Sequence, residues 1–256
     1  MRIGVLMDPP QRLGGAGANS WAFNEAVPAS VELVPCPPDN VVEGLDAYII
    51  HNCVMYSKWV IPKLQGKPVF KVIHDIWRDG DTALRAWLID HATLIMVSPE
   101  MTKRHNWHGR YKAIHYIPSP IDIDKFTSEN TSRNGRAIWV GRLHYKKGVA
   151  NAIQWAQDND YPLDIYGYGN PDIAGEFYRG EIANEKLPAL LSDYSRFVFL
   201  PAAFDSCPRT TLEAYFAGCE LIINDNCGSR YWLENDIPAL RSATADFWRV
   251  ITDVKL

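Results

Sequence analysis

The fold of this chain is decided by residues 204–219, which read FDSCPRTTLEAYFAGC. The apolar run before them, Phe197 to Leu200, is short, aromatic or β-branched and closed by Pro201, which is typical of a buried parallel strand. A helix of about two turns is expected to begin near Arg209 and to end at Gly218, where a left-handed cap is favoured. The residues suited to its start are Pro208, Thr210 and Thr211.

Two carboxylates flank the start of this expected helix. Asp205 lies before it and Glu213 lies further inside it. Free backbone N–H groups and the positive end of the helix dipole favour an anion between them. Such a site suits a ligand with both phosphate and hydroxyl groups. An ordinary strand, loop and helix with two solvated acids stays open as the alternative.

The composition is that of a globular protein. With 256 residues, 47% apolar and 22% charged, the chain can bury one large core or two small ones. Its net charge of −4 lacks the basic excess of a typical nucleic-acid binder. No apolar run reaches the about 18 residues of a membrane span or has the form of a secretory signal, so a cytoplasmic protein is expected. The basic and aromatic stretch 103–112 leaves an anionic acceptor or a peripheral membrane contact open.

Neither cysteines nor aspartates form a convincing metal site. The five cysteines are an odd number without a C-x-x-C pair, which indicates reduced thiols. They are Cys36, Cys53, Cys207, Cys219 and Cys227. The D-x-D pair of Asp122 and Asp124 is weak evidence, because Asp79 with Asp81 and Asp158 with Asp160 repeat it. We therefore assign no metal ligands.

In the first half of the chain, apolar runs alternate with helix-compatible segments. The expected strands are 3–7, 31–34, 47–50, 69–73, 94–97 and 114–117, and the expected helices are 18–27, 57–65, 81–91 and 99–107. This alternation predicts a doubly wound α/β domain. The glycine-rich turn 13–20 does not read G-x-G-x-x-G, so a structural role competes with a ligand-binding one. His74 follows a strand at the edge where open α/β sheets bind ligands, although a lone histidine is usually structural.

The polar stretch 127–136 leads into a second series of elements, so domains are expected at 1–130 and 131–256. After strand 137–140, Arg142 and Lys147 precede a helix that runs to about residue 159. Two cations at a helix start predict an anion site, with a solvated basic loop as the alternative. The other expected elements are a strand and glycine turn at 163–169, a strand at 177–182, a helix capped by Asn184, a strand at 220–223, a turn at 226–229 that starts a helix, and a last helix around 245–251.

Four of these segments resemble motifs of the retaining family 4 glycosyltransferases, enzymes of the GT-B fold. Asp205 and Glu213 keep the spacing of the E-x7-E signature, with aspartate in the first place. Residues 141–149, GRLHYKKGV, resemble the G-R-L segment that ends in K-G, and the Gly14-Gly15 turn and the His74-Asp75 pair resemble two more. The resemblance covers nearly the whole chain, although this chain is shorter than the usual members. It implies two Rossmann-like, doubly wound α/β domains that face each other across a cleft.

The resemblance also implies roles for the matching residues. Asp205 and His74 would lie beside the donor sugar, and Glu213 would contact the ribose of the nucleotide. Arg142 and Lys147 would hold the diphosphate, which completes a catalytic set with His74 and Asp205. The further residues implied in donor binding are Gly14, Gly15, Gly167, Tyr168, Gly169, Ser206, Cys207, Pro208, Arg209 and Thr210.

We therefore expect a retaining, hexosyltransferase-like glycosyltransferase without a bound metal ion or a tightly bound cofactor. The donor would be a UDP-, GDP- or ADP-sugar bound by the second domain, and the last helix would pack back on the first. The acceptor, whether saccharide, lipid-linked sugar, protein or modified nucleic acid, stays open. The alternatives are a degenerate nucleotide-sugar-binding protein and a GT-B hydrolase or epimerase. A nicotinamide dehydrogenase is disfavoured, because neither glycine turn fits the dinucleotide fingerprint.

Overall fold

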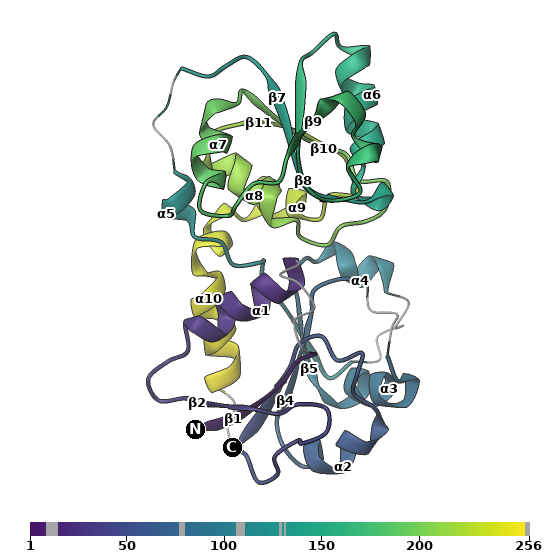
Figure 1. Cartoon of the computed structure of the whole chain (residues 1–256). Helices are drawn as coiled ribbons and strands as arrows, with labels where there is room; N and C mark the ends of the chain where they lie inside the picture. The colour runs from purple at the N-terminus through teal and green to yellow at the C-terminus, as the bar shows by residue number, and fades with distance from the viewer. Residues whose placement is uncertain (9–14, 77–79, 106–110, 128–129, 131, 254–256) are drawn as a thin grey trace. The chain divides into compact units, whose positions relative to one another are not determined.

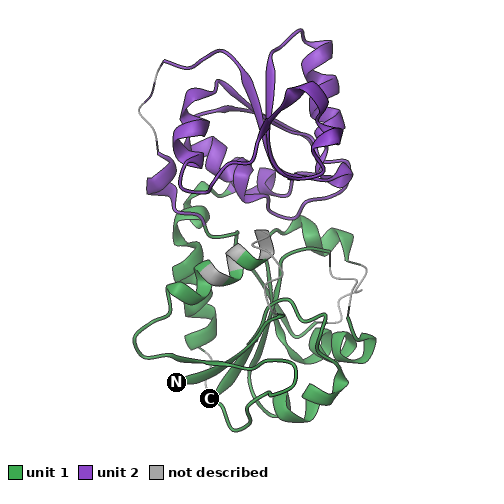
Figure 2. Cartoon of the chain, in the orientation of Figure 1, with its two compact units in different colours: residues 1–120, 236–256 green, residues 121–235 purple. Residues whose placement is uncertain are grey.

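A computed structural model describes residues 1–8, 15–76, 80–105, 111–127, 130 and 132–253. The chain forms two compact units, which Figure 2 colours separately. Unit 1 comprises residues 1–120 and 236–256, and unit 2 comprises residues 121–235. Each unit contains one parallel sheet with helices, so the α/β class expected from the sequence is confirmed. The division by packing starts unit 2 at Ile121, before the domain boundary expected near residue 130.

Unit 1 is built on a six-stranded parallel sheet in the order β2-β1-β3-β4-β5-β6 (Figure 1). The strands are β1 (Arg2–Leu6), β2 (Glu32–Pro35), β3 (Ala47–Ile50), β4 (Val69–Ile73), β5 (Thr93–Met96) and β6 (Ala113–Tyr116). The central strands β3 and β4 are buried along their whole lengths, as parallel strands covered on both faces are. Their bounds are those expected, and the other four strands differ from expectation by one residue at each end.

The helices of unit 1 include one from the far end of the chain. They are α1 (Gly15–Glu25), α2 (Ile61–Leu64), α3 (Thr82–His91), α4 (Glu100–Arg104) and α10 (Ile237–Thr252), with the 3-10 helix η1 (Lys58–Val60). Asp81 starts α3 by accepting hydrogen bonds from the backbone N–H groups of Ala83 and Leu84. Figure 1 shows α10 beside α1, where the Phe247 ring stacks on Phe23 at 4.1 Å between centroids.

Unit 2 is built on a five-stranded parallel sheet in the order β11-β10-β7-β8-β9. The strands are β7 (Ala137–Leu143), β8 (Leu163–Gly169), β9 (Tyr178–Gly180), β10 (Arg196–Phe199) and β11 (Glu220–Ile223). Trp139 on the central strand β7 is fully buried, and its ring stacks near Phe199 of β10. The register of β7 and β8 sets Arg142 opposite Tyr168.

The helices of unit 2 follow the strands in alternation. They are α5 (Ile123–Phe126), α6 (Val149–Asp158), α7 (Leu187–Asp193), α8 (Arg209–Phe216) and α9 (Ser229–Asn235), with the 3-10 helices η2 (Tyr145–Lys147), η3 (Pro171–Ile173) and η4 (Gly175–Phe177). Helix α8 begins at Arg209 as expected, and Gly218 after its end has a left-handed φ of 82°. None of the helices in the described ranges is both long and apolar enough to cross a bilayer.

Three expectations about helix starts and caps were wrong. Asn184 does not cap α7, which begins at Leu187, because the following Pro188 suits a first turn. Neither Thr210 nor Thr211 caps α8, whose N-cap is Pro208 without a side-chain hydrogen bond. The last helix begins at Ile237 rather than near residue 245. Asp236 accepts a hydrogen bond from the Ala239 N–H at that start.

Each unit has its own apolar core. In unit 1 the core joins the sheet to α10, and in unit 2 it surrounds β7 and β10. The Asp164 carboxylate of β8 is held inside unit 2 by hydrogen bonds from Arg136, Arg179 and Tyr194. None of the five cysteines forms a disulfide, as expected, and all five are buried. The Asp122 carboxylate caps α5 by accepting from the Lys125 N–H, which gives it a structural role.

Candidate functional site

The carboxyl ends of β7, β10 and β11 bring three loops together in unit 2. Because these strands are parallel, the segments that follow them emerge at the same edge of the sheet. The backbone N–H groups of Ala202 and Ala203 bond the Lys146 carbonyl, which ties the loop after β10 to η2. The Asp205 N–H bonds the Asn226 carbonyl, which ties the same loop to the one after β11. Asp205 thus lies where the three segments meet.

Two glycines allow this close approach. A Cβ atom on Gly148, whose φ is 77°, would lie 2.0 Å from the Leu200 carbonyl oxygen. A Cβ atom on Gly228 would lie 2.0 Å from the Ser206 carbonyl oxygen. Any larger residue at either position would therefore push the loop that carries Asp205 out of place.

Lys147 and Asp205 form an ion pair at this edge. The Lys147 ammonium donates to Oδ2 of Asp205 at 2.5 Å, and the two side chains are 38% and 14% exposed. Arg142, at the end of β7, is exposed, and its guanidinium makes no hydrogen bond or ion pair with the described residues. Lys146 is exposed too, with its ammonium 5.8 Å from the centre of the Tyr145 ring. Of the two cations expected at an anion site, Lys147 is therefore paired with Asp205, and Arg142 has no ion-pair partner among the described residues.

The start of α8 adds backbone donors to the same loop. Pro208 is the N-cap, and no side chain caps the helix. The Ser229 hydroxyl instead donates to the Pro208 carbonyl at 2.9 Å and so fixes the entry to the helix. Ser206, Cys207 and Pro208 are buried, while Arg209 and Thr210 in the first turn are partly exposed. The uncapped start leaves N–H groups that can face an anion.

Glu213 is buried in α8 next to a cation. The Arg209 guanidinium lies 3.5 Å from its carboxylate, one turn earlier in the helix. Burial raises the pKa of Glu213 above its ordinary value, although the charges of Arg209 and of Lys125 in α5 oppose that rise. Lys125 was not among the residues predicted from the sequence, because only the packing of α5 on α8 brings it near Glu213.

The glycine turn expected to line a nucleotide pocket lies at the end of β8. A Cβ atom on Gly167 would lie 1.8 Å from the Gly141 carbonyl oxygen, and one on Gly169 would lie 2.8 Å from the Leu143 carbonyl oxygen. Glycine therefore lets β8 approach β7 closely at the point where Arg142 stands opposite Tyr168. The turn and Arg142 share one edge of unit 2.

His74 lies in unit 1, at the carboxyl end of β4. Its Nε2 atom is 3.3 Å from Nδ1 of His51 and 3.4 Å from the Ser20 hydroxyl. Burial, with the nearby charge of Lys71, lowers the pKa of His74 to about 3, so its imidazole is neutral. His51 was not predicted as a site residue, although it follows strand 47–50 as His74 follows strand 69–73. Nδ1 of His74 and Nε2 of His51 are buried and have no hydrogen-bond partner among the described residues.

The remaining sequence candidates are the glycines before α1. Gly15 is the first residue of α1, whereas Gly14 lies outside the described residues. Of the candidates in the described ranges, those at residues 142–213 share unit 2, and Gly15 and His74 belong to unit 1.

No family model and no curated protein matches this sequence. Solved structures do match its fold. Sucrose-phosphate synthase from Thermosynechococcus elongatus is similar with a TM-score of 0.68, 14% identity and coverage of 99% of this chain and 90% of that chain. HepE from Anabaena, solved with UDP and glucose, is similar with a TM-score of 0.66, 14% identity and coverage of 90% and 82%. AviGT4, a glycosyltransferase of avilamycin A biosynthesis, is similar with a TM-score of 0.63, 14% identity and coverage of 96% and 88%.

These similarities extend over both parallel sheets of the chain. At 14% identity they concern the backbone and not the chemistry of particular side chains. The two sheets with their alternating helices, matched over nearly the full length, identify the fold as GT-B, the fold of the glycosyltransferases that this chain resembles.

Proposed function

We propose that this protein transfers a sugar, with retention of configuration, from a nucleotide diphosphate sugar to an acceptor. The GT-B fold and the nucleotide sugars bound by structural neighbours support this proposal. One observation carries it: Arg142, Lys147 and the uncapped start of α8 lie at one edge of the unit 2 sheet. Cations and free N–H groups at one edge suit a diphosphate.

In the proposed reaction the bond from the sugar to the diphosphate breaks, and negative charge grows on the leaving phosphate. Arg142 and Lys147 would stabilise that charge, assisted by the N–H groups at the start of α8. Arg142 makes no ion pair with the described residues, so its charge is available to a ligand. These groups are partly in place before the donor binds, which lowers the reorganisation needed in the transition state.

We assign Asp205 two tasks. Its Oδ2 atom holds the Lys147 ammonium, which fixes that cation near the start of α8. Oδ1 has no hydrogen-bond partner among the described residues, so it can accept from a hydroxyl of the donor sugar. Aspartate is one methylene shorter than the glutamate usual at this place, and this difference would affect the choice of sugar.

The remaining candidate residues are assigned to the ribose, the nucleotide and the sugar of the donor. Glu213 would accept from the ribose hydroxyls, and the Gly167 to Gly169 turn would line the nucleotide pocket. His74 would contact the donor sugar from unit 1. We expect that turnover does not require a divalent ion. We also expect the protein to act in the cytoplasm.

The experiment starts with the donor. Thermal-shift screening of nucleoside diphosphates and their sugars should select one nucleotide, because a ligand at 100 times its dissociation constant stabilises by about 2.7 kcal/mol. Release of the nucleoside diphosphate from the selected donor then measures turnover, with and without pooled acceptors. Arg142→Ala and Lys147→Ala should each lower turnover on the order of 10² to 10³-fold and weaken donor binding less.

Lys146→Ala is the matched control, because Lys146 has the same charge but its ammonium lies over the Tyr145 ring and forms no ion pair with Asp205. It should change turnover little. If Lys146→Ala were the damaging change and Lys147→Ala the harmless one, the proposed site would be wrong. Nucleotide binding without turnover under any acceptor pool would favour a degenerate binding protein. A rate independent of acceptor would favour a hydrolase.

A further inference from the structure

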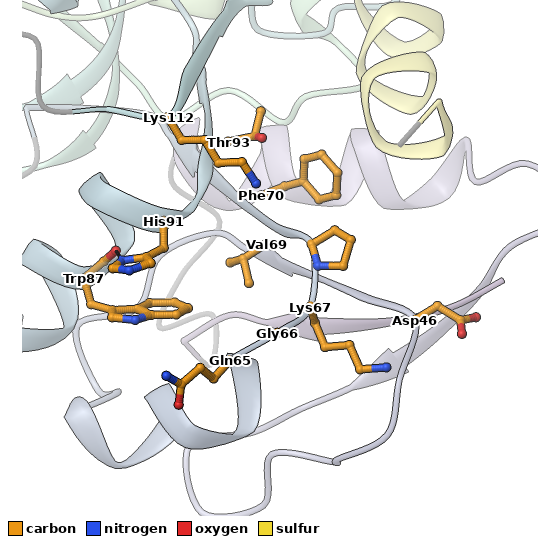
Figure 3. Close-up of a pocket in the computed structure, with 11 residues that line it drawn as sticks. Asp46, Gln65, Gly66, Lys67, Val69, Phe70, Trp87, His91, Thr93 and Lys112 are labelled. Carbon is orange, nitrogen blue, oxygen red and sulfur yellow. Dashed lines mark hydrogen bonds between the residues drawn. The ribbon is translucent and has the colours of Figure 1, made fainter. Parts of the chain in front are cut away.

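Figure 3 shows a hollow of unit 1, whose volume is about 560 Å³. It lies at the edge of the sheet opposite to the one where His74 follows β4. Residues at the amino ends of β4 and β5 and in the last turns of α3 line it. The strands are parallel, so this edge is distinct from the one where the carboxyl ends gather. The volume falls within the roughly 300 to 1,000 Å³ typical of small-molecule sites. None of its lining residues has a part in the proposed transfer.

One side of the hollow is aromatic. The rings of Trp87 and His91 stack with 4.9 Å between centroids and 10° between planes, and Figure 3 shows them lying parallel. Nδ1 of His91 is 2.9 Å from the Trp87 carbonyl oxygen, which fixes the imidazole against the indole. Val69 is 3% exposed, whereas the Phe70 ring belongs to the core that includes Phe247. A stacked aromatic pair beside an apolar side chain suits the C–H face of a sugar ring.

The rim of the hollow carries two cations. Lys67 before β4 and Lys112 before β6 are exposed, and neither ammonium has an ion-pair partner among the described residues. The one carboxylate in the lining, Asp46, accepts a hydrogen bond from the Arg2 N–H at 2.7 Å. Two lysines against one acid give a local positive excess in a chain whose net charge is −4. This excess selects for an anionic ligand.

We propose that the hollow binds an acidic saccharide, that is, one or two sugar rings that carry an anionic group. The Trp87 and His91 pair would take a ring face, Lys67 and Lys112 the anion, and Gln65 and Thr93 the hydroxyls. An inorganic anion would leave most of a hollow of about 560 Å³ unfilled. This saccharide site lies in unit 1, apart from the phosphate-binding residues of unit 2, and its role goes beyond the proposed sugar transfer.

The test uses the full chain and two matched disaccharides, cellobiouronic acid and cellobiose, with inorganic phosphate as a third probe. Calorimetry in low salt should find cellobiouronic acid bound at least about fivefold more tightly than cellobiose, and less tightly as salt screens the lysines. Lys67→Gln and Lys112→Gln should each weaken its binding about two- to fivefold, the range of exposed ion pairs. His91→Ala should weaken both disaccharides.

Lys58→Gln is the control, because Lys58 lies in unit 1 with the same charge but outside the lining. Equal affinity for the two disaccharides, equal effects of Lys58→Gln and Lys112→Gln, or phosphate binding as tight as the acid sugar would overturn the proposal. Displacement of the sugar by UDP would place it in the nucleotide site and would also overturn it. If the acidic disaccharide bound as expected but no nucleotide did, the proposed transfer would be refuted and the saccharide site would be supported.

Discussion

At the residue scale, the buried carboxyl group of Glu213 shows how a proposed ligand contact affects stability. Its pKa is raised by burial, against the opposing charges of Arg209 and Lys125. A raised pKa in the folded state means that the native protein holds this proton more tightly than the unfolded chain. The stabilisation that comes from binding this proton is therefore fully present below pH 4.5, the pKa of this group in the unfolded chain. It is lost as the pH rises through the pKa of the folded state.

Glu213→Gln should accordingly stabilise the ligand-free protein at pH 8, because it removes a buried charge that the charges of Arg209 and Lys125 do not fully offset. The gain should be smaller at pH 5. The same change should weaken nucleotide binding about tenfold, since a hydrogen bond to a charged group is lost. Urea unfolding at the two pH values and calorimetry with the nucleotide measure both effects. Glu185→Gln, at an exposed position, is the control. A Glu213→Gln protein less stable at pH 8 than the original would contradict this account.

At the element scale, helix α10 is held to unit 1 by one apolar face. Its buried side chains are Leu240, Ala243, Phe247, Trp248 and Ile251, spaced as on one side of a helix. The Trp248 indole N–H also donates to the Phe23 carbonyl at 2.9 Å. The contacts span more than two hundred residues of sequence, so this helix closes the core of the unit that the chain begins.

Phe247→Ala should therefore destabilise unit 1 by about 3 to 5 kcal/mol, the usual cost of removing a buried aromatic ring. Hydrogen exchange should locate the loss in β1 and β3 rather than in β7 and β10. Arg249→Ala on the exposed face should cost little, because among the described residues the Arg249 guanidinium forms an ion pair with Asp246 of its own helix and with no other carboxylate. Faster exchange confined to unit 2 would show that α10 stabilises a different part of the chain.

At the scale of the whole molecule, unit 2 is one continuous segment and unit 1 is not. A fragment cut at the expected boundary, 131–256, would lose α5 and would carry α10 without Phe23. The fragment 121–235 keeps α5 on α8 and leaves α10 with unit 1.

We expect fragment 121–235 to fold and to bind the nucleoside diphosphate within about tenfold of the whole chain. The proposed phosphate and ribose contacts all lie within it, which is the physical reason. Calorimetry on both fragments and on the full chain tests this. A fragment 121–235 with a dispersed NMR spectrum but no binding, while the whole chain binds, would remove the nucleotide site from unit 2.

Local pattern in the sequence determined most elements. Strands 47–50, 69–73 and 220–223 were predicted with their observed bounds, because short apolar runs between polar breaks leave little choice of register. Helix α8 began where expected, since Pro208 suits a helix start and Gly218 a left-handed end. The start of α10 was missed because only its last turns were read as helix.

Tertiary structure alone decided which side chains meet. Lys147 and Asp205 are 58 residues apart, and His51 and His74 are 23 apart. Which loops become neighbours depends on the order of parallel strands, and that order is set by how the helices pack across each sheet rather than by any local pattern. The burial of Glu213, the approach of Lys125 and the hollow beside Trp87 arise in the same way. Each requires two or more distant segments to be packed together before the feature exists.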